Sequence, residues 1–296
     1  MNSFNLFHPP TENKPCKQLQ EMFLPKKKAR KNSIVSRVKS FFESIINAPI
    51  SLFHKLCFWV GFSVVSAVSV IVGAVLIFIY MSPSIGSMTF EDIKKIAESK
   101  IPKTAKHSWV SIDDISRHYL YAIVVSEDGQ FFQHNGVNYD SILNSIAVNI
   151  KKRSFAVGAS TISQQVVKNL FLTREKSIVR KLSELYLTNR LEKRFSKNQI
   201  LEIYLNLIEV GPDMYGVNIA AKHYFAKKPK NINAAEGAFI SLMLPSPRRH
   251  HLSIFSNKHL APKHKRKLKR IFSDMQYFEY ISPDQYSEYL TYQYFK

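Results

Sequence analysis

The stretch RKLSELYLTNRLEKRFSKNQILEIYLN, from Arg180 to Asn206, decides the fold class of this chain. Up to Phe195 it alternates apolar and charged positions at helical spacing and contains neither glycine nor proline. Ser196 and Gln199 then form a capping-box pattern ahead of apolar residues that are three and four positions apart. The stretch therefore predicts two consecutive amphipathic helices.

The same signals recur on both sides of this stretch. Ser111 with Asp114 forms a capping-box pattern that predicts a helix from about Ile115 onward, and Asn233 with Glu236 predicts another. Alternation of apolar and polar residues with the period of a strand is scarce. A mainly α fold is therefore predicted, and an all-β fold or a doubly wound sheet is disfavoured.

The N-terminal third contains a long uncharged segment. No charged residue occurs between Leu56 and Phe90, and CFWVGFSVVSAVSVIVGAVLIFIY, from Cys57 to Tyr80, is long enough to cross the hydrocarbon of a bilayer as a helix. A signal peptide would have its apolar region close to the N-terminus, whereas this one begins more than fifty residues into the chain. A transmembrane helix that stays as an anchor is predicted over 56–81.

Charge is unevenly distributed around this segment. Residues 1–55 hold ten Lys and Arg against three acidic residues, so the positive-inside rule places this tail in the cytoplasm. Residues 91–296 then lie on the other side of the membrane. They hold 32 basic and 19 acidic residues, and the net charge of the whole chain is +20. Nucleic acid is excluded as a partner there, and the surplus suits anionic lipid head groups and phosphorylated lipids.

These patterns divide the chain into four parts. The polar, proline-containing residues 1–32 are expected to be disordered, and 34–54 are expected to form a helix on the cytoplasmic leaflet. The predicted parts are a basic cytoplasmic tail over 1–55, the transmembrane helix over 56–81, a linker and domain entry over 82–108, and one catalytic domain over 109–296.

Cysteine and histidine patterns exclude some chemistry. Cys16 and Cys57 both precede the outer domain, which therefore has neither disulfides nor cysteine catalysis. The ten histidines show no metal-ligand spacing, and the adjacent pair His250 and His251 follows two arginines. No metal site is predicted.

The segment SEDGQFFQHNG, from Ser126 to Gly136, is the first candidate site. Glu127 and Asp128 are adjacent, so on a helix only one of them can point into a cleft unless the helix ends there. The structural alternatives are an exposed carboxylate at a helix end and a hydrogen-bonded structural role for His134.

The segment GASTISQQVVKN, from Gly158 to Asn169, is the second. Ser160 or Thr161 can cap a helix here, and an apolar face formed by Ile162, Val166 and Leu170 is expected opposite a polar stripe. The stripe consists of Thr161, Gln164, Gln165 and Lys168. Hydroxyls, amides and one cation suit a polyoxygenated or phosphate ligand, and an ordinary surface stripe is the alternative.

Arg180 and Glu184 form the third candidate, because four residues apart they share one helix face. A plain surface ion pair is the alternative. Taken together and in this order, however, the three segments resemble glycosyltransferase family 51, the peptidoglycan glycosyltransferases.

The resemblance rests on EDGQFFQHNG, GASTISQQ, RKLSE and KNQILEIYLN, which occur in the order of the family's motifs. GVNIAAKHYFAKKP followed by EGAFISLMLPSPRR resembles the monofunctional biosynthetic transglycosylases in particular. The similarity covers Trp109 to Arg249 and continues weakly to residues 281–286. It implies a lysozyme-like fold with a head lobe and a membrane-apposed jaw lobe.

The resemblance also implies roles for residues. Glu127 matches the catalytic base and Glu184 the second carboxylate. Lys176 stands where relatives often have Arg, so the charge is kept and the bidentate fork is lost, and a late arginine motif is too blurred in KHKRKLKRIF to assign. The residues expected to bind substrate are His134, Ser160, Thr161, Gln164, Gln165, Lys168, Lys176, Arg180 and Lys181.

The implied reaction joins lipid II to a growing lipid-linked glycan through β-1,4 bonds, by inversion, with release of undecaprenyl pyrophosphate. Glu127 would take the proton of the acceptor hydroxyl, and the cations would stabilise the departing pyrophosphate. A hydrolase on this fold expels a sugar alcohol and needs a protonated acid instead, so the cations favour synthesis. No cofactor is firmly implied; Mg²⁺ or Mn²⁺ would suit the pyrophosphate, but no carboxylate cluster dictates one.

The expected location is the bacterial inner membrane, with a single pass, a cytoplasmic N-terminus and a periplasmic catalytic domain. The SxxK sequence from Ser36 to Lys39 lies in the tail, so no transpeptidase domain is expected. Expected partners are lipid II, the growing strand, the membrane, and proteins of cell-wall synthesis or division. The alternatives are a cell-wall hydrolase and a catalytically silent, membrane-anchored scaffold of the wall-building machinery.

Overall fold

The computed structural model describes residues 32–81, 83–153, 158–173, 175 and 177–295. The chain separates into two compact units, Met1–Tyr80 and Met81–Lys296. Most of the predicted disordered stretch, 1–31, lies outside the described residues.

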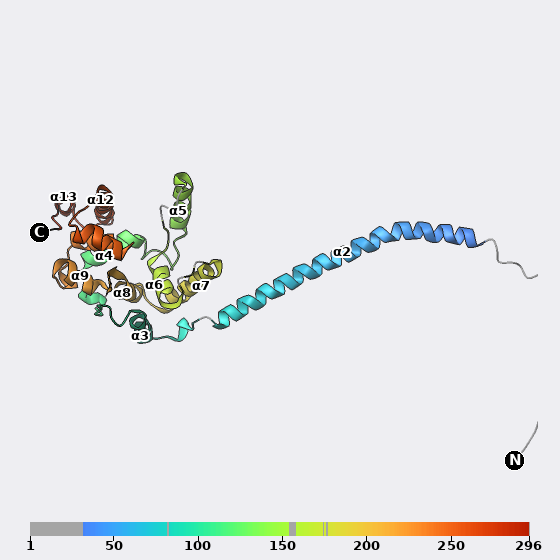
Figure 1. Cartoon of the computed structure of the whole chain (residues 1–296), viewed down its shortest axis with the longest axis horizontal. Helices are drawn as coiled ribbons and strands as arrows, with labels where there is room; N and C mark the ends of the chain where they lie inside the picture. Colours follow the sequence, from blue (N-terminus) through green and yellow to red (C-terminus); the bar gives the residue numbers. More distant parts are fainter. Residues whose placement is uncertain (1–31, 82, 154–157, 174, 176, 296) are drawn as a thin grey trace, which may run out of the picture. The chain divides into compact units, whose positions relative to one another are not determined.

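Helix α2, Asn32–Met81, accounts for the described part of the first unit (Figure 1). The helix runs without a break through both the predicted leaflet helix at 34–54 and the predicted span at 56–81. Its segment Ile34–Val75 contains an 18-residue stretch with a mean hydropathy of 2.2 and is long and apolar enough to cross a membrane. Its large apolar side chains, such as Trp59, are exposed in the isolated chain. Length and composition are thus compatible with a membrane anchor.

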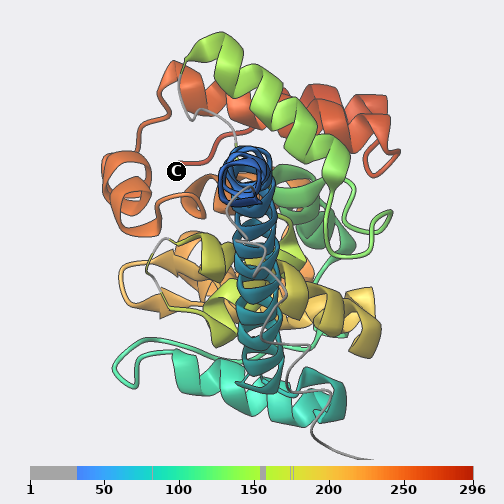
Figure 2. The ribbon, with the colours of Figure 1, turned by 90° about the vertical axis from the view of Figure 1, so that its right-hand side faces the viewer.

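The second unit is built almost entirely of helices, as predicted. Figures 1 and 2 both place α3 at one end of it and α12 and α13 at the other, with α6, α7 and α8 between them. Its α-helices are α3 (Phe90–Lys100), α4 (Arg117–Asp128), α5 (Tyr139–Lys152), α6 (Ile162–Phe171), α7 (Ile178–Arg194), α8 (Lys197–Leu207), α9 (Val217–Phe225), α10 (Ala234–Met243), α11 (Pro247–His250), α12 (Pro262–Tyr277) and α13 (Pro283–Leu290).

Short elements connect these helices. The 3-10 helices are η1 (Ile85–Ser87), η2 (Ile112–Asp114) and η3 (Pro229–Asn231), and η4 (His251–Ser256) is a π-helix. Strands β1 (Glu209–Gly211) and β2 (Met214–Tyr215) pair antiparallel in a two-stranded sheet.

The core centres on α10, in which every residue is buried. Helix α4 packs closely against it, because a Cβ on Gly237 would lie 3.1 Å from the Cα of Tyr119. Helix α12 packs on both α4 and α10, and α6 packs on α7 and α8. This arrangement brings the end of α4, the start of α6 and one face of α12 together.

Two of the three predicted capping boxes are confirmed. In α8 and α10 the serine or asparagine cap and the side chain three residues later exchange both hydrogen bonds. The box at Ser111 is wrong: Ser111 precedes the short η2, and α4 begins at Arg117 with Ser116 as its cap. The Ser116 hydroxyl accepts from the N–H of Tyr119 and donates to the carbonyl of Ile232, a long-range contact that fixes the start of the helix.

Candidate active site

Asp128, the last residue of α4, joins three segments of the site. Its side chain is 4% exposed, and the carboxylate accepts hydrogen bonds from His134 Nε2 at 3.0 Å and from the backbone N–H of Ile162 at 3.0 Å. Both acids line the cleft, which is possible because α4 ends at Asp128. The carboxylate of Asp128 is engaged by these two donors, whereas the oxygens of Glu127 have only contacts of 3.5 Å or longer.

His134 is held inside the protein. Its Nδ1 accepts the backbone N–H of Gly136 at 3.1 Å, which leaves the proton on Nε2 for Asp128. Both ring nitrogens are thus engaged, as in the structural alternative, and a contact with substrate would require one of these bonds to break. Gly136 has a φ of +90°, and a Cβ there would lie 2.7 Å from Thr188 Cγ2, so the turn packs directly on α7.

Glu127 lines a hollow of about 160 Å³, called the base hollow here, at the start of α6. One carboxylate oxygen lies 3.5 Å from Gln165 Nε2 and the other lies 3.5 Å from Ser126 Oγ. Ser160 is exposed and lines the same hollow. A half-buried carboxylate with open space beside it can accept a proton from a hydroxyl that enters the hollow.

Lys267 of α12 also reaches Glu127, with its Nζ 3.9 Å from a carboxylate oxygen. Burial lowers the pKa of Lys267, and the charge of Glu127 opposes that shift. Sequence reasoning missed this residue. Helical periodicity offered a signal, since Lys267 borders the inward-facing positions His264, Leu268 and Ile271, but no sequence pattern shows that α12 packs on α4.

The predicted polar stripe of α6 divides in two. Thr161 caps the helix and donates to the carbonyl of Gly136 at 2.6 Å, and Gln164 completes the capping box. Gln164 is only 1% exposed, and its Nε2 has no hydrogen-bond partner among the described residues. Gln165 is half-buried and Lys168 is exposed. The open stripe therefore begins one turn later than predicted, because the first turn of α6 is packed against the turn at Gly136.

Glu184 of α7 is 3% exposed and binds two cations. Arg180 Nη1 lies 3.2 Å from one oxygen, and the Lys181 ammonium bonds the other. The pair of Arg180 with Glu184 is therefore not a plain surface ion pair, because its carboxylate is buried. A buried carboxylate that is shared by two cations orients both of them and leaves a net positive charge.

Arg180 meets Lys168 at a second hollow of about 390 Å³, called the cation hollow here. Lys100 also lines it, and so does Glu209, which accepts a hydrogen bond from Arg248. Lys181 is not among its lining residues, and Lys176 lies outside the described residues. Three cations around one hollow can bind a phosphate or pyrophosphate.

Helix α6 connects the two hollows. Thr161, at its start, lines the base hollow, and Lys168, in its last turn, lines the cation hollow. Seven residues of helix separate these positions by on the order of 10 Å. Within the described part of the chain, no group of three or more His, Cys, Asp or Glu could hold a metal ion.

The sequence of this chain is similar to those of known proteins. The family model described as transglycosylase matches residues 92–276. The chain is 39% identical to the biosynthetic peptidoglycan transglycosylase of Paraburkholderia phytofirmans over 176 residues, which cover 60% of this chain and 73% of that protein. It is 38% identical to the protein of that name from Nitrosospira multiformis over 169 residues, 57% and 74% of the two chains.

The chain is also 35% identical to penicillin-binding protein 1A of Clostridium tetani over 216 residues, 72% of this chain and 27% of that protein. The family fold is mainly helical and lysozyme-like, which confirms the predicted fold class. A family match over more than half of the sequence, together with these relatives, shows that the chain belongs to the transglycosylase family.

Proposed function

We propose that this chain is a membrane-anchored peptidoglycan glycosyltransferase that polymerises lipid II into β-1,4-linked glycan and releases undecaprenyl pyrophosphate. One observation carries the proposal: α6 connects a hollow that contains a half-buried carboxylate to a hollow that is lined by three cations. The first suits deprotonation of an acceptor sugar, and the second suits a pyrophosphate leaving group. The names of the relatives agree with this assignment.

Glu127 acts as the general base in this proposal. The acceptor's 4-hydroxyl is a poor nucleophile until a base takes its proton, and Glu127 is a half-buried carboxylate that lines the base hollow. Asp128 is engaged by His134 and Ile162, so it is not available for this task. The hydroxyl oxygen then attacks the donor's anomeric carbon from the face opposite the pyrophosphate, which inverts the α linkage to β.

The cation hollow stabilises the leaving group. A lipid pyrophosphate is a weak base, so its departure needs positive charge and hydrogen-bond donors more than it needs an acid. Lys168 and Arg180 line the cation hollow, and Glu184 holds Arg180 and Lys181 in place from behind. Glu184 is thus a positioning residue, as are Thr161, Gln164 and His134, whereas Ser160 and Gln165 are placed to contact sugars.

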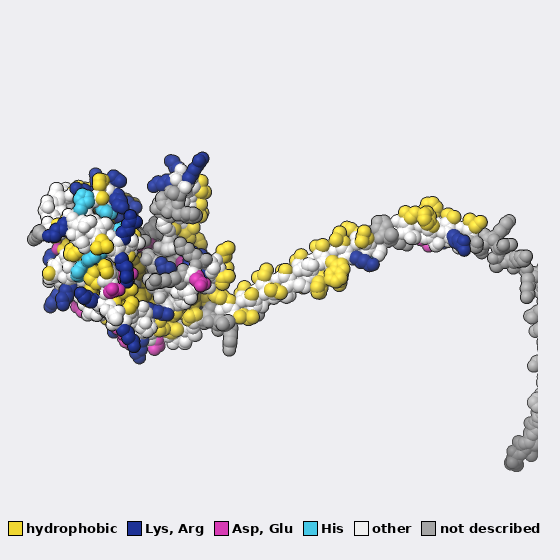
Figure 3. Space-filling view, viewed as in Figure 1, with side chains coloured by type: hydrophobic (Ala, Val, Ile, Leu, Met, Phe, Trp, Pro, Cys, Tyr) yellow, Lys and Arg dark blue, Asp and Glu magenta, His cyan; other side chains and the backbone are white. Residues whose placement is uncertain are grey.

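The surface of α5 supports a membrane-apposed lobe. Tyr139, Leu143, Ile146 and Ile150 form an exposed apolar stripe on α5 at spacings of three and four residues, and Tyr139 is 72% exposed. In Figure 1, α5 projects from the rest of the domain, and Figure 3 shows Lys and Arg at its tip with apolar side chains along its flank. An apolar flank with a basic tip suits the surface of an anionic bilayer.

This surface and α2 fit an inner-membrane protein with a cytoplasmic tail and a periplasmic catalytic domain. A cell-wall hydrolase would have little use for the cation hollow, and a silent scaffold would have little use for either hollow. A divalent cation could join the cations at the pyrophosphate. Incubation of the purified full-length protein with labelled lipid II tests the proposal, since polymer forms only if the chain is a glycosyltransferase.

A further inference from the structure

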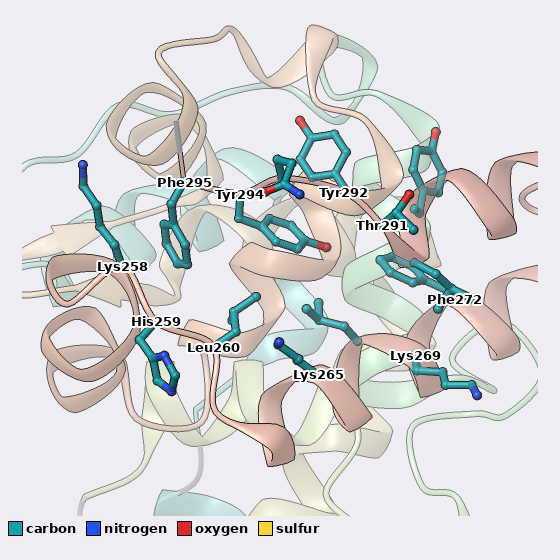
Figure 4. Close-up of a pocket in the computed structure, with 14 residues that line it drawn as sticks. Lys258, His259, Leu260, Lys265, Lys269, Phe272, Thr291, Tyr292, Tyr294 and Phe295 are labelled. Atoms are coloured by element: carbon teal, nitrogen blue, oxygen red, sulfur yellow. The ribbon is translucent and has the colours of Figure 1, made fainter.

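A pocket of about 550 Å³ lies at the opposite side of α12 from Glu127. Three parts of the chain bound it: α12, the segment 258–260 that precedes α12, and the C-terminal residues 289–295 (Figure 4). The C-terminal residues lie beyond the part of the chain that matches the transglycosylase family. The pocket, called the C-terminal pocket here, contributes nothing to the two hollows of the proposed reaction.

Among the described residues, three lysines and no acidic side chain line the C-terminal pocket. In Figure 4 Lys265 points toward the interior, while Lys258 and Lys269 stand at opposite ends. Within the described residues, none of the three forms an ion pair. Lys258 also adopts a left-handed backbone with a φ of 47°, directly after the π-helix η4. An elongated row of unpaired cations suits a ligand with several separated negative charges.

Aromatic side chains form the wall between these cations. Phe272 and Tyr289 are buried behind the pocket, and Tyr294 stacks on Phe239 with ring centroids 5.1 Å apart. The Tyr294 hydroxyl is buried and has no hydrogen-bond partner among the described residues, whereas the Tyr292 hydroxyl donates to Glu236 at 2.8 Å. The pocket thus offers an apolar wall and one polar atom that lacks a partner.

The backbone of the C-terminal residues favours a peptide ligand over a sugar or a lipid. Residues 292–295 belong to no helix or strand, and the backbone groups of 293–295 form no hydrogen bond with any described residue. An irregular segment with free N–H and C=O groups can pair with another extended chain, as an exposed sheet edge does. A sugar or a lipid head group would use the cations but not this row of alternating donors and acceptors.

We propose that the C-terminal pocket binds an extended, acidic peptide segment of a partner protein. Its carboxylates lie against Lys258, Lys265 and Lys269, and its backbone pairs with residues 293–295. One of its apolar side chains packs on the wall formed by Phe272 and Tyr294. This inference does not depend on the proposed reaction, because no residue of the two hollows takes part in it.

Binding of short fluorescent peptides to the full-length protein in detergent micelles tests the inference, measured by anisotropy. The probe is Glu-Val-Glu-Phe-Glu, and the controls are Lys-Val-Lys-Phe-Lys and a Glu-Val-Glu-Phe-Glu peptide that is methylated on its backbone nitrogens. The acidic peptide should bind at least about tenfold more tightly than either control, a difference of about 1.4 kcal/mol. The methylated control keeps the charges and cannot pair.

Lys265→Glu should weaken binding of the acidic peptide at least about tenfold, as expected for a central contact of an interface. Lys230→Glu is the matched control, because Lys230 is an exposed lysine outside the pocket and the change in net charge is the same. Thermal melts of both variants verify that they are folded.

Three results would overturn the inference. Equal binding of the acidic peptide and its methylated form would exclude backbone pairing. Equal losses in Lys265→Glu and Lys230→Glu would assign the binding to overall charge. If association with phosphatidylglycerol vesicles, and not with the peptide, responds to Lys265→Glu, the pocket binds a lipid surface and not a protein segment.

Discussion

The ammonium group of Lys267 lies 3.9 Å from a carboxylate oxygen of Glu127, across the contact between α12 and α4. Lys267 also donates to the carbonyl of Ser241 at 3.4 Å, which fixes it on the α10 side. The ammonium group thus links the proposed base to α10 and helps to fix the position of its carboxylate. Lys267 is therefore a positioning and electrostatic partner of the proposed base.

Lys267→Met should lower kcat/KM for lipid II polymerisation, because the Glu127 carboxylate loses the ammonium group that lies against it. Lys267→Arg is the matched control, since it keeps the charge and should keep most of the rate. Initial rates of lipid II polymerisation and thermal melts measure both variants. Equal kcat/KM values for the wild type and folded Lys267→Met would remove Lys267 from the site.

The cation hollow leads to a second prediction. Lys168→Ala and Arg180→Ala should each reduce kcat about a hundred- to a thousandfold, or about 2.7 to 4 kcal/mol, because their interaction with pyrophosphate strengthens as the bond breaks. Arg180→Lys should recover only part of the loss, since the planar fork is absent. Single-turnover polymerisation with thermal melts measures these effects.

The alternative for these cations is a solvated helix face. In that case each substitution would change the free energy of unfolding by no more than about 0.5 kcal/mol and leave the rate unchanged. Arg180 has a further structural part because it contacts the buried Glu184. Lys168 is exposed and forms no ion pair with any residue that the structure describes, so its substitution gives the cleaner comparison. A normal rate in folded Lys168→Ala would contradict the proposal that the cation hollow stabilises the leaving group.

How much of this site the sequence predicts depends on the range of the contacts involved. Caps such as Ser196 with Gln199 are local, so spacing alone finds them. The choice of Ser116 over Ser111 depends on a hydrogen bond to Ile232, 116 residues away, which no local pattern contains. The same holds for Lys267, because only the packing of α12 brings it to Glu127.

The polar stripe of α6 shows the same limit within one helix. Periodicity correctly groups Thr161, Gln164, Gln165 and Lys168, but it does not show how far a neighbouring segment covers them. The turn at Gly136 buries the first two, and the last two remain accessible. The sequence likewise does not show whether one or both of Glu127 and Asp128 line the cleft, because this depends on where α4 ends.

Membrane orientation is a third prediction. The surplus of basic residues over 1–55 predicts, by the positive-inside rule, that residues 91–296 lie outside the cytoplasm. Protease added to intact spheroplasts should digest the domain and spare the N-terminal tail, and detergent-treated spheroplasts serve as the control in which both are accessible. Antibodies against a tag at each end report the fragments. Protection of the domain in intact spheroplasts would overturn the proposed periplasmic location.

His264 of α12 leads to a prediction about stability. Burial lowers the pKa of His264 below the usual 6.5, and the positive charge of Lys263 adds to this. Both ring nitrogens are buried without a partner among the described residues. As the pH falls below 6.5, the unfolded chain takes up a proton that the folded protein does not, so the folded state loses stability.

Thermal melts between about pH 7 and 5 measure this loss. The wild type should lose stability with decreasing pH more steeply than His264→Phe, by at most about 1.36 kcal/mol per pH unit for one group. The difference between the two slopes should vanish above about pH 7, where His264 is neutral in the folded and the unfolded state. Parallel curves for the two proteins over the whole range would show that His264 titrates equally in the folded and unfolded chains.

The most direct test of the proposed function is single-turnover polymerisation of labelled lipid II by Glu127→Gln. This variant keeps the size of the side chain and removes its basicity, so turnover should fall about a hundred- to ten-thousandfold while the melting temperature and lipid II binding stay near those of the wild type. Asp128, the other carboxylate that lines the base hollow, is engaged by His134 and Ile162 and should not replace it. Polymer formed at a nearly normal rate by folded Glu127→Gln would contradict the assignment of Glu127 as the base.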